Sequence, residues 1–198
     1  MTAPIRREFE EGIAQLETPL GLAILQWAVG LVLVFGLIGC VVKGADNPSD
    51  PYLQTQGAGG RTRLAGFGET RVTVQSADSV LEWCLLLALT DQQRARGLME
   101  VLDPTLGGYN GMLFRYDADV TQAFWMRNTP MPLSIAYLNG EGHIVSLEDM
   151  DPCGDSPDCR SYPPAGPYRF AIEVPRGNLP ALGIVEGATI FDQKTGCA

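Results

Sequence analysis

A short run of aromatic, cationic and amide side chains lies at residues 124–129, which read FWMRNT. In a strand, alternate side chains point to the same face, so Trp125 and Arg127 share one face. An aromatic ring and a cation can together frame a shallow pocket for a polar ligand, and Asn128 begins the turn that follows. The competing interpretation assigns these residues to core packing and to capping of that turn.

Two charged residues outside this run form a second possibility, and one of them, Glu173, lies in a predicted strand among apolar neighbours. Arg96 belongs to the segment RARGLM at 94–99, and Glu173 belongs to the segment YRFAIEV at 168–174. A charge in such surroundings is seldom buried without a partner. A structural ion pair between Arg96 and Glu173 would satisfy both charges; alternatively, one of them faces a pocket and holds a polar ligand. The ligand-binding candidates are therefore Arg96, Trp125, Arg127, Asn128 and Glu173.

The residue types predict no catalytic residue, no cofactor and no metal site. The single histidine, His143, lies beside a predicted hairpin turn, so a nucleophilic triad with Ser134 lacks support. The chain carries no glycine-rich nucleotide fingerprint, and zinc sites use more closely spaced Cys and His ligands. The formal charge of −9 argues against a nucleic-acid partner, because binding a phosphate backbone requires a basic face.

The five cysteines divide into one near the amino end and four farther along, which are Cys84, Cys153, Cys159 and Cys197. Outside the cytoplasm an even set is expected to pair, and four cysteines allow three connectivities. The short step between Cys153 and Cys159 passes through Gly, Pro and Asp, which suits a local loop. This spacing favours the pair Cys153–Cys159, and Cys84 then pairs with Cys197 by elimination.

Residues 20–42 contain no charged side chain, and 23 such residues are enough to cross a bilayer as a helix. We therefore expect the chain to be anchored in the cell membrane through this segment. Arg6 and Arg7 precede the segment and Lys43 follows it, which favours a cytoplasmic location for residues 1–19. The domain beyond the anchor would then be extracytoplasmic.

Two interpretations of the end of the anchor remain open. Residues 37–40, Leu-Ile-Gly-Cys, resemble the lipobox of bacterial lipoproteins, in which the residue matching Cys40 is lipidated and the preceding segment is removed. Alternatively, Cys40 lies at the outer end of an uncleaved anchor helix. Residues 43–69 are rich in Gly and poor in large apolar side chains, so they predict a flexible linker. The domain would then span residues 70–198.

The elements that must position the candidate residues are mostly short strands separated by turn residues. The patterns predict strands at 71–76, 81–89, 111–115, 123–127, 133–138, 143–147, 168–174 and 188–192. The strand at 81–89 is nearly all apolar and is expected to be buried on both faces. An acidic turn around Asp117 and Asp119 would join the strands at 111–115 and 123–127. Thr90 and Gln93 form a predicted capping box that starts a short helix, and 178–182 predicts one helical turn.

About eight short strands with one or two small helices favour a mainly β domain, an antiparallel sandwich or barrel. Strands do not alternate with long helices, so an α/β fold is not expected.

Several motifs resemble those of the bacterial and archaeal family named domain of unknown function 192. They are RARGLM at 94–99, GMLF at 111–114, FWMRNTPMPLSIAYL at 124–138, GEGHIV at 140–145, the Cys pair that follows Pro152, and YRFAIEVPRG at 168–177. The resemblance implies a compact, jelly-roll-like sandwich and often an amino-terminal signal or anchor. The family has no established activity, so the resemblance supplies no catalytic residue. Many members have an acid at the position of Ser134, which here is a hydroxyl.

The sequence thus predicts a membrane-tethered, extracytoplasmic binding or accessory module of the cell envelope. Its expected ligand is an envelope glycan, a small polar molecule or a partner protein. The alternative is an enzyme acting on a cell-envelope or small polar substrate, with a pocket around Arg96, Asn128 and Glu173. A purely structural partner of a membrane complex is a third possibility, which an exposed apolar patch would favour.

Overall fold

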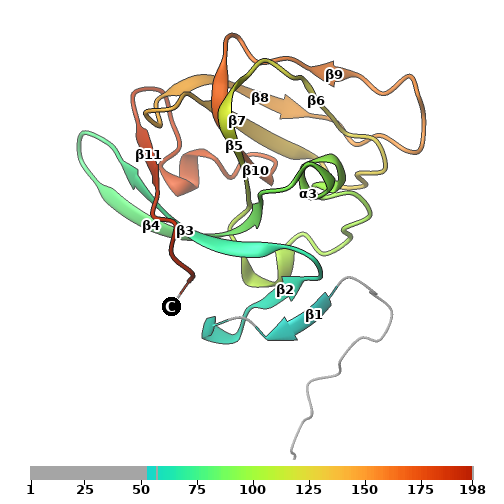
Figure 1. Cartoon of the computed structure of the whole chain (residues 1–198), viewed down its shortest axis with the longest axis horizontal. Helices are drawn as coiled ribbons and strands as arrows, with labels where there is room; N and C mark the ends of the chain where they lie inside the picture. Colours follow the sequence, from blue (N-terminus) through green and yellow to red (C-terminus); the bar gives the residue numbers. More distant parts are fainter. Residues whose placement is uncertain (1–52, 57, 198) are drawn as a thin grey trace, which may run out of the picture. The chain divides into compact units, whose positions relative to one another are not determined.

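A computed structural model describes residues 53–56 and 58–197, and this part of the chain is mainly β (Figure 1). Seven strands form one large sheet in the order β11-β3-β4-β5-β10-β7-β8. Their bounds are β3 Gly68–Gln75, β4 Val80–Ala88, β5 Met112–Val120, β7 Leu133–Leu138, β8 Ile144–Met150, β10 Tyr168–Pro175 and β11 Thr189–Asp192. Two further pairs form small sheets: β1 Leu53–Gln56 with β2 Thr62–Leu64, and β6 Phe124–Trp125 with β9 Ser161–Tyr162.

The large sheet is mixed, which corrects the expected antiparallel sandwich. β4 and β5 pair in parallel, whereas every other pair within this sheet is antiparallel. A parallel pair needs a long crossover, and here the crossover carries the helix α3 (Asp91–Arg96) and the 3-10 helix η2 (Leu106–Gly108). The strand patterns did not reveal this crossover, because its single regular helix has only six residues.

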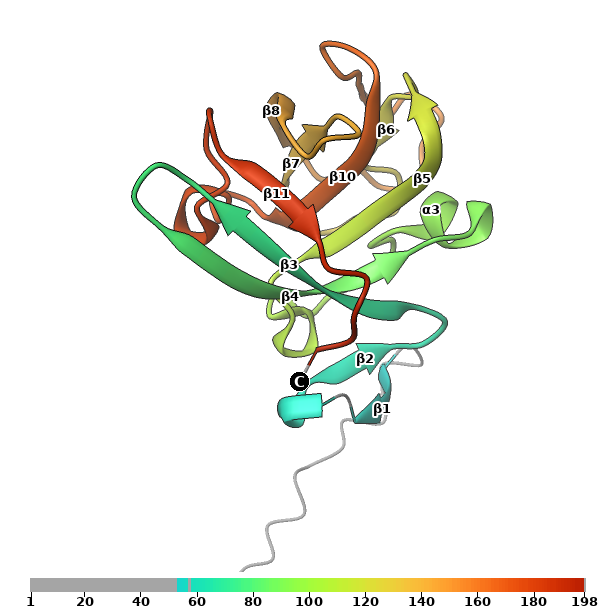
Figure 2. The same cartoon turned by 60° about the vertical axis from the view of Figure 1, so that its left-hand side comes forward.

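The two edges of the large sheet meet, so the sheet curves back on itself (Figure 2). His143, in the turn between β7 and β8, forms an antiparallel bridge with Thr189 of β11. The Ile190 amide donates to the Gly142 carbonyl at 2.9 Å. Gly142 has φ 86°, and an added Cβ would lie 2.0 Å from the Ile190 carbonyl oxygen. Only glycine allows this contact.

Both faces of β4 are buried over residues 85–88, as its apolar run predicts, whereas residues 80–84 are exposed or partly exposed. Leu85 and Leu87 belong to one hydrophobic cluster, the inner core, which the segment around the 3-10 helix η3 (Pro180–Leu182) joins. Leu86 and Ala88 belong to the other cluster, the outer core, which includes residues of the crossover and of the segment after β6. The candidate site lies over the outer core.

The predicted linker, residues 43–69, is wrong over its described part. Residues from 53 onward include β1, a 3-10 helix η1 (Ala58–Gly60) and β2, and Leu64 and Phe67 are buried in the outer core. The prediction of a linker followed from the abundance of glycine in this segment, although Leu64 and Phe67 are enough to anchor it to the core. The segments 1–19, 20–42 and 43–52, with Cys40, lie outside the described residues. Among the residues that the structure describes, no helix is long and apolar enough to cross a membrane.

The acidic turn predicted between two strands is also wrong. β5 continues through Asp117 and Asp119 as far as Val120, where it pairs with Tyr168 of β10. Asp119 forms an ion pair with Arg169 of that neighbouring strand at 2.8 Å. Acidic side chains therefore lie on an exposed strand end here, and their charge alone does not distinguish a strand end from a turn.

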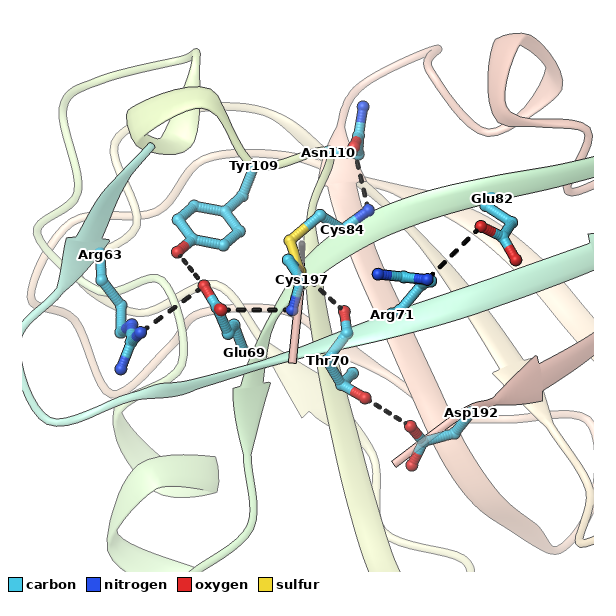
Figure 3. Close-up of a disulfide and its surroundings, with 10 residues drawn as sticks. All are labelled: Arg63, Glu69, Thr70, Arg71, Glu82, Cys84, Tyr109, Asn110, Asp192 and Cys197. Carbon is cyan, nitrogen blue, oxygen red and sulfur yellow. Dashed lines mark hydrogen bonds and ion pairs between the residues drawn. A yellow bond between two sulfur atoms is a disulfide. The ribbon is translucent and has the colours of Figure 1, made fainter. Parts of the chain in front are cut away.

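The cysteines form the two pairs that their spacing favours. Cys84 of β4 is joined to Cys197 near the carboxyl end, 113 residues away (Figure 3). Cys153 and Cys159 close a loop of sequence separation six. One bridge therefore ties the chain's last segment to a central strand, and the other shapes a local loop.

Candidate functional site

The helix α3 forms one wall of the candidate site and begins at the predicted capping box. The Gln93 amide donates to Thr90 Oγ1 at 3.2 Å, and the Thr90 amide donates to Gln93 Oε1 at 3.0 Å. Each bond satisfies an amide that the helix itself leaves unpaired. The helix ends at Gly97, which has φ 48°, and an added Cβ would lie 3.2 Å from the Phe114 ring. Glycine therefore lets the helix end approach the aromatic floor of the site.

A groove of about 280 Å³ lies between α3 and β6. We call it the groove; its lining residues are Asp91, Arg94, Ala95, Tyr116, Gln122, Ala123, Phe124 and Trp125. Trp125 remains 50% exposed, which is unusual for so large an aromatic side chain. The groove combines aromatic surface with charged and amide groups, as small-molecule sites do.

Arg94 is held in place by several acceptors rather than left mobile in the groove. Its Nη1 donates to the carbonyls of Leu89 and Arg115, the latter at 2.9 Å, and its Nη2 pairs with Asp91. Its guanidinium carbon lies 4.6 Å from the centre of the Tyr116 ring. The guanidinium thus contributes a fixed, largely satisfied cation to the groove wall.

A smaller hollow of about 30 Å³, the inner cavity, shares Arg94, Ala95, Phe124 and Trp125 with the groove. Its other lining residues are Arg96, Gly97, Leu98, Met99, Phe114, Thr129 and Glu173. Because four residues line both spaces, we treat the groove and the inner cavity as one site. The inner cavity is large enough for a single water-sized group.

Glu173 is the buried acid of the inner cavity. It lies in the middle of β10, opposite Met112 of β5 and Ile135 of β7, and is 4% exposed. Within the described residues its carboxyl makes no hydrogen bond and no ion pair. Burial raises the pKa of this carboxyl to about 8, because the charged form is poorly solvated there. The group is therefore mostly protonated at neutral pH.

Arg96 does not form the expected ion pair with Glu173 within the described structure, although both residues line the inner cavity. Its Nη1 donates to the Ala65 carbonyl at 2.8 Å, and its guanidinium carbon lies 5.0 Å from the centre of the Phe67 ring. The guanidinium is thus engaged by the segment between β2 and β3. The interpretation of a structural ion pair is wrong, because the helix end directs Arg96 to this neighbouring segment.

The remaining two candidates lie elsewhere. Arg127 pairs with Asp155, with Nε 2.6 Å from Oδ1. Asn128 has φ 54° and lines a separate, mainly apolar pocket of about 440 Å³ with Pro130 and Cys153. Three of the five candidates, Arg96, Trp125 and Glu173, therefore come together, whereas Arg127 and Asn128 do not join them.

Several residues that line the site are not among the five candidates from the sequence, and Arg94, Tyr116 and Thr129 are three of them. Arg94 belongs to the same motif as Arg96, so the motif itself was the available signal. Tyr116 lies in the segment that was expected to approach a turn. Thr129 borders both the inner cavity and the Asn128 pocket. Its position depends on a turn whose tertiary contacts are not visible in the sequence.

Ser134 and His143, which the sequence does not support as members of a nucleophilic triad, both make structural contacts. Ser134 donates to Asp149 at 2.5 Å and accepts from the Gly177 amide at 2.9 Å, and it does not line the inner cavity. Ser134 therefore lies outside the candidate site. His143 Nδ1 lies 3.2 Å from Thr189 Oγ1, where the sheet edges meet.

A second cluster of polar groups surrounds the Cys84–Cys197 bridge (Figure 3). Glu69 accepts from the Tyr109 hydroxyl at 2.6 Å and from the Cys197 amide at 3.2 Å, and it lies 3.7 Å from Arg63. The Glu69 carboxylate and the two sulfurs lie within 4.8 Å of one another. The sulfurs are bonded to each other, and a metal ligand would need a free thiolate. This cluster fixes the carboxyl end.

Comparison with known proteins places these features in a family. The model of the DUF192 family, described as "Uncharacterized ACR", matches residues 72–191. A protein of unknown function from Novosphingobium aromaticivorans DSM 12444 is 26% identical, with a TM-score of 0.53, covering 70% of this chain and 91% of that one. A "putative transcription regulator" from Sinorhizobium meliloti 1021 is 23% identical, with a TM-score of 0.52, covering 64% and 95%. No curated protein matches the chain.

Proposed function

We propose a function for this chain from the premise that it belongs to the DUF192 family, whose members are uncharacterised. It is a membrane-tethered, extracytoplasmic binding module of the cell envelope. Its ligand is a small polar molecule that lies in the groove between α3 and β6 and reaches the inner cavity.

The observation that carries this proposal is the position of Glu173. A buried carboxyl without a hydrogen-bond partner in the described chain costs free energy that an apolar side chain would not. Such a group at the end of a cavity is typical of functional sites. The cavity shares four lining residues with the groove, among them the half-exposed Trp125, so the acid lies beside a space that a ligand can enter.

The cellular location is proposed from the sequence and supported by the bridges. Residues 20–42 are long and apolar enough for an anchor, and disulfides persist mainly in oxidising compartments. In this arrangement the ligand would be met outside the cytoplasm.

Native mass spectrometry of the full chain, extracted in mild detergent from its host membranes, tests the binding function. We expect a small bound mass in the wild type and its loss in Trp125→Ala, because the aromatic wall of the groove is removed. Leu102→Ala is the matched control, since Leu102 is 75% exposed and lines the Asn128 pocket instead. A bare wild-type mass, or equal occupancy in Trp125→Ala, would contradict the proposal.

Membrane fractionation tests the anchor. We expect the full chain in the membrane fraction after an alkaline wash, and a chain lacking residues 20–42 in the soluble fraction. The mass of Cys40→Ser beside that of the wild type distinguishes the two forms. An uncleaved anchor changes only by the exchange of sulfur for oxygen, whereas a lipidated form also loses its lipid and keeps its leader. A full chain that the wash releases would overturn the membrane tether.

An enzyme is the second candidate, and the same residue favours it. A carboxyl with a pKa near 8 can transfer a proton at neutral pH. Incubating the protein with the bound molecule identified by mass spectrometry separates the two functions. An enzyme would convert that molecule and lose activity in Glu173→Gln, whereas a binding module would return it unchanged.

A further inference from the structure

We infer that the inner cavity receives a primary ammonium group of the ligand, with the Glu173 carboxylate as its counter-ion and the rest of the ligand in the groove. This inference rests on the proposed function, because the groove must first admit a small polar molecule. It specifies the chemical class of that molecule.

The size of the inner cavity limits what can reach Glu173. A hollow of about 30 Å³ holds one water-sized group, so a ring or a branched group would remain in the larger groove. An ammonium group has about the size of a water molecule and carries three donors. The two carboxyl oxygens of Glu173 can accept two of them. The Thr129 hydroxyl donates to the Arg127 carbonyl at 3.3 Å and retains lone pairs for a third.

The two arginines that line the cavity are held by groups other than Glu173. Arg94 is engaged by Asp91 and by two carbonyls, and Arg96 by the Ala65 carbonyl and the Phe67 ring. Neither arginine forms an ion pair with Glu173 in the described structure. A ligand ammonium would supply the opposite charge, and the new ion pair would offset the desolvation of the carboxylate.

The aromatic lining adds to this preference. Phe114, Phe124 and Trp125 border the same hollow, and the rings of Phe114 and Phe124 meet edge to face with centres 4.9 Å apart. Aromatic faces attract cations, most strongly in desolvated surroundings. An anionic ligand group would share the hollow with the Glu173 acid, and the two cations that line it, Arg94 and Arg96, already have other partners.

Three matched probes test the inference on the full chain in detergent. Ethanolamine, ethylene glycol and glycolate share a hydroxymethyl group and differ in the second group, which is an ammonium, a hydroxyl or a carboxylate. We expect ligand-observed NMR titration at pH 7 to give ethanolamine an affinity at least about tenfold above that of the others. Glu173→Gln, an uncharged isostere, is expected to reduce this preference to about twofold or less.

A second measurement needs no variant. The carboxyl must lose its proton to pair with the ammonium, so ethanolamine should bind more than about tenfold tighter at pH 8 than at pH 6. The other ionisable groups near Glu173 are Arg94 and Arg96 of α3 and Tyr137 of β7. Arginine stays charged throughout this range, and burial raises the pKa of Tyr137 above its usual value. None of them accounts for such a change.

The outcomes separate this inference from the proposed function. Equal binding of the three probes, or tighter binding of glycolate, overturns the ammonium assignment while the site still binds polar molecules. Failure of all three probes to bind also overturns it, and the bound mass recovered from host membranes then decides the binding function independently. Ethanolamine binding that Glu173→Gln and pH leave unchanged would show that Glu173 is not the counter-ion.

Discussion

At the scale of single residues, the burial of Glu173 has a consequence for stability. Its carboxyl is buried in the middle of a strand, and its pKa is raised from 4.5 to about 8 by burial. Between these two pH values the unfolded chain has released the proton and the folded chain retains it. Raising the pH therefore favours the unfolded state across this window. The residue lowers stability at neutral pH, which is consistent with a role in binding.

Glu173→Gln should remove this pH dependence. We expect the free energy of unfolding of the wild type, relative to the variant, to fall between pH 5 and pH 8 with a slope of up to about 1.4 kcal/mol per pH unit. Denaturant unfolding of the full chain in detergent, followed by tryptophan fluorescence, measures it. Glu186→Gln is the control, because Glu186 is exposed. If the wild-type and Glu173→Gln curves were parallel, the pKa of Glu173 would be the same in the folded and unfolded states.

At the scale of elements, α3 is a short helix that must stay ordered to form a wall of the groove. None of its residues is buried, so its order depends on its ends and on its two anchored arginines. The Thr90–Gln93 capping box and the close contact of Gly97 with Phe114 hold the ends, and Arg94 and Arg96 donate to carbonyls of neighbouring segments. A six-residue helix is not stable by itself in water, so loss of the cap should reduce the order of the groove wall that the helix forms.

Thr90→Ala tests this dependence. Loss of the cap should cost about 1 kcal/mol of unfolding free energy and lower the occupancy of the bound molecule. Denaturant unfolding and native mass spectrometry measure the two effects on one sample. Thr121→Ala serves as the control, because Thr121 is exposed in the loop after β5. If both variants kept wild-type occupancy, the helix start would be irrelevant to the groove.

The loop closed by Cys153 and Cys159 supports the opposite side of the site. The Cys153 amide donates to the Thr129 carbonyl at 3.3 Å, and the Asn128 amide donates to the Gly154 carbonyl at 3.2 Å. These bonds hold the turn that places Thr129 at the inner cavity. A loop far along the chain therefore helps to shape the site.

At the scale of the whole molecule, two features close the fold. The Gly142–Ile190 contact joins the edges of the sheet, and the Cys84–Cys197 bridge ties the carboxyl end to β4. The chain between these cysteines includes most of the sheet. Their bridge therefore constrains the unfolded chain far more than the local bridge does.

Removing the two bridges separately should reveal this difference. Cys84→Ser/Cys197→Ser should lower the unfolding free energy by about 2–3 kcal/mol more than Cys153→Ser/Cys159→Ser, because the closed loops span 113 and 6 residues. Denaturant unfolding of both double variants in detergent gives the comparison. Equal losses would indicate that loop closure does not govern the contribution of these bridges.

Local patterns in the sequence determined much of this molecule. The apolar run at 81–89, the hairpin around residues 139–142 and the Thr90–Gln93 capping box each form as predicted, because their signals lie within a few residues. The favoured cysteine pairing follows for the same reason, since one pair is local and leaves only one other. Trp125 and Glu173 were also recognisable as candidate residues from their neighbours.

Only the tertiary structure decided how these parts meet. The parallel pairing of β4 and β5 depends on a crossover of about two dozen residues that has little periodic signal. The contacts of Arg96 depend on Ala65 and Phe67, which lie in a segment whose composition indicates a linker. The inner cavity is formed by four segments, around residues 94–99, 114, 124–129 and 173, that are separate in the chain. A local pattern does not predict contacts between segments that are distant in the chain. These contacts result from packing onto a sheet whose strand order differs from the order in the sequence.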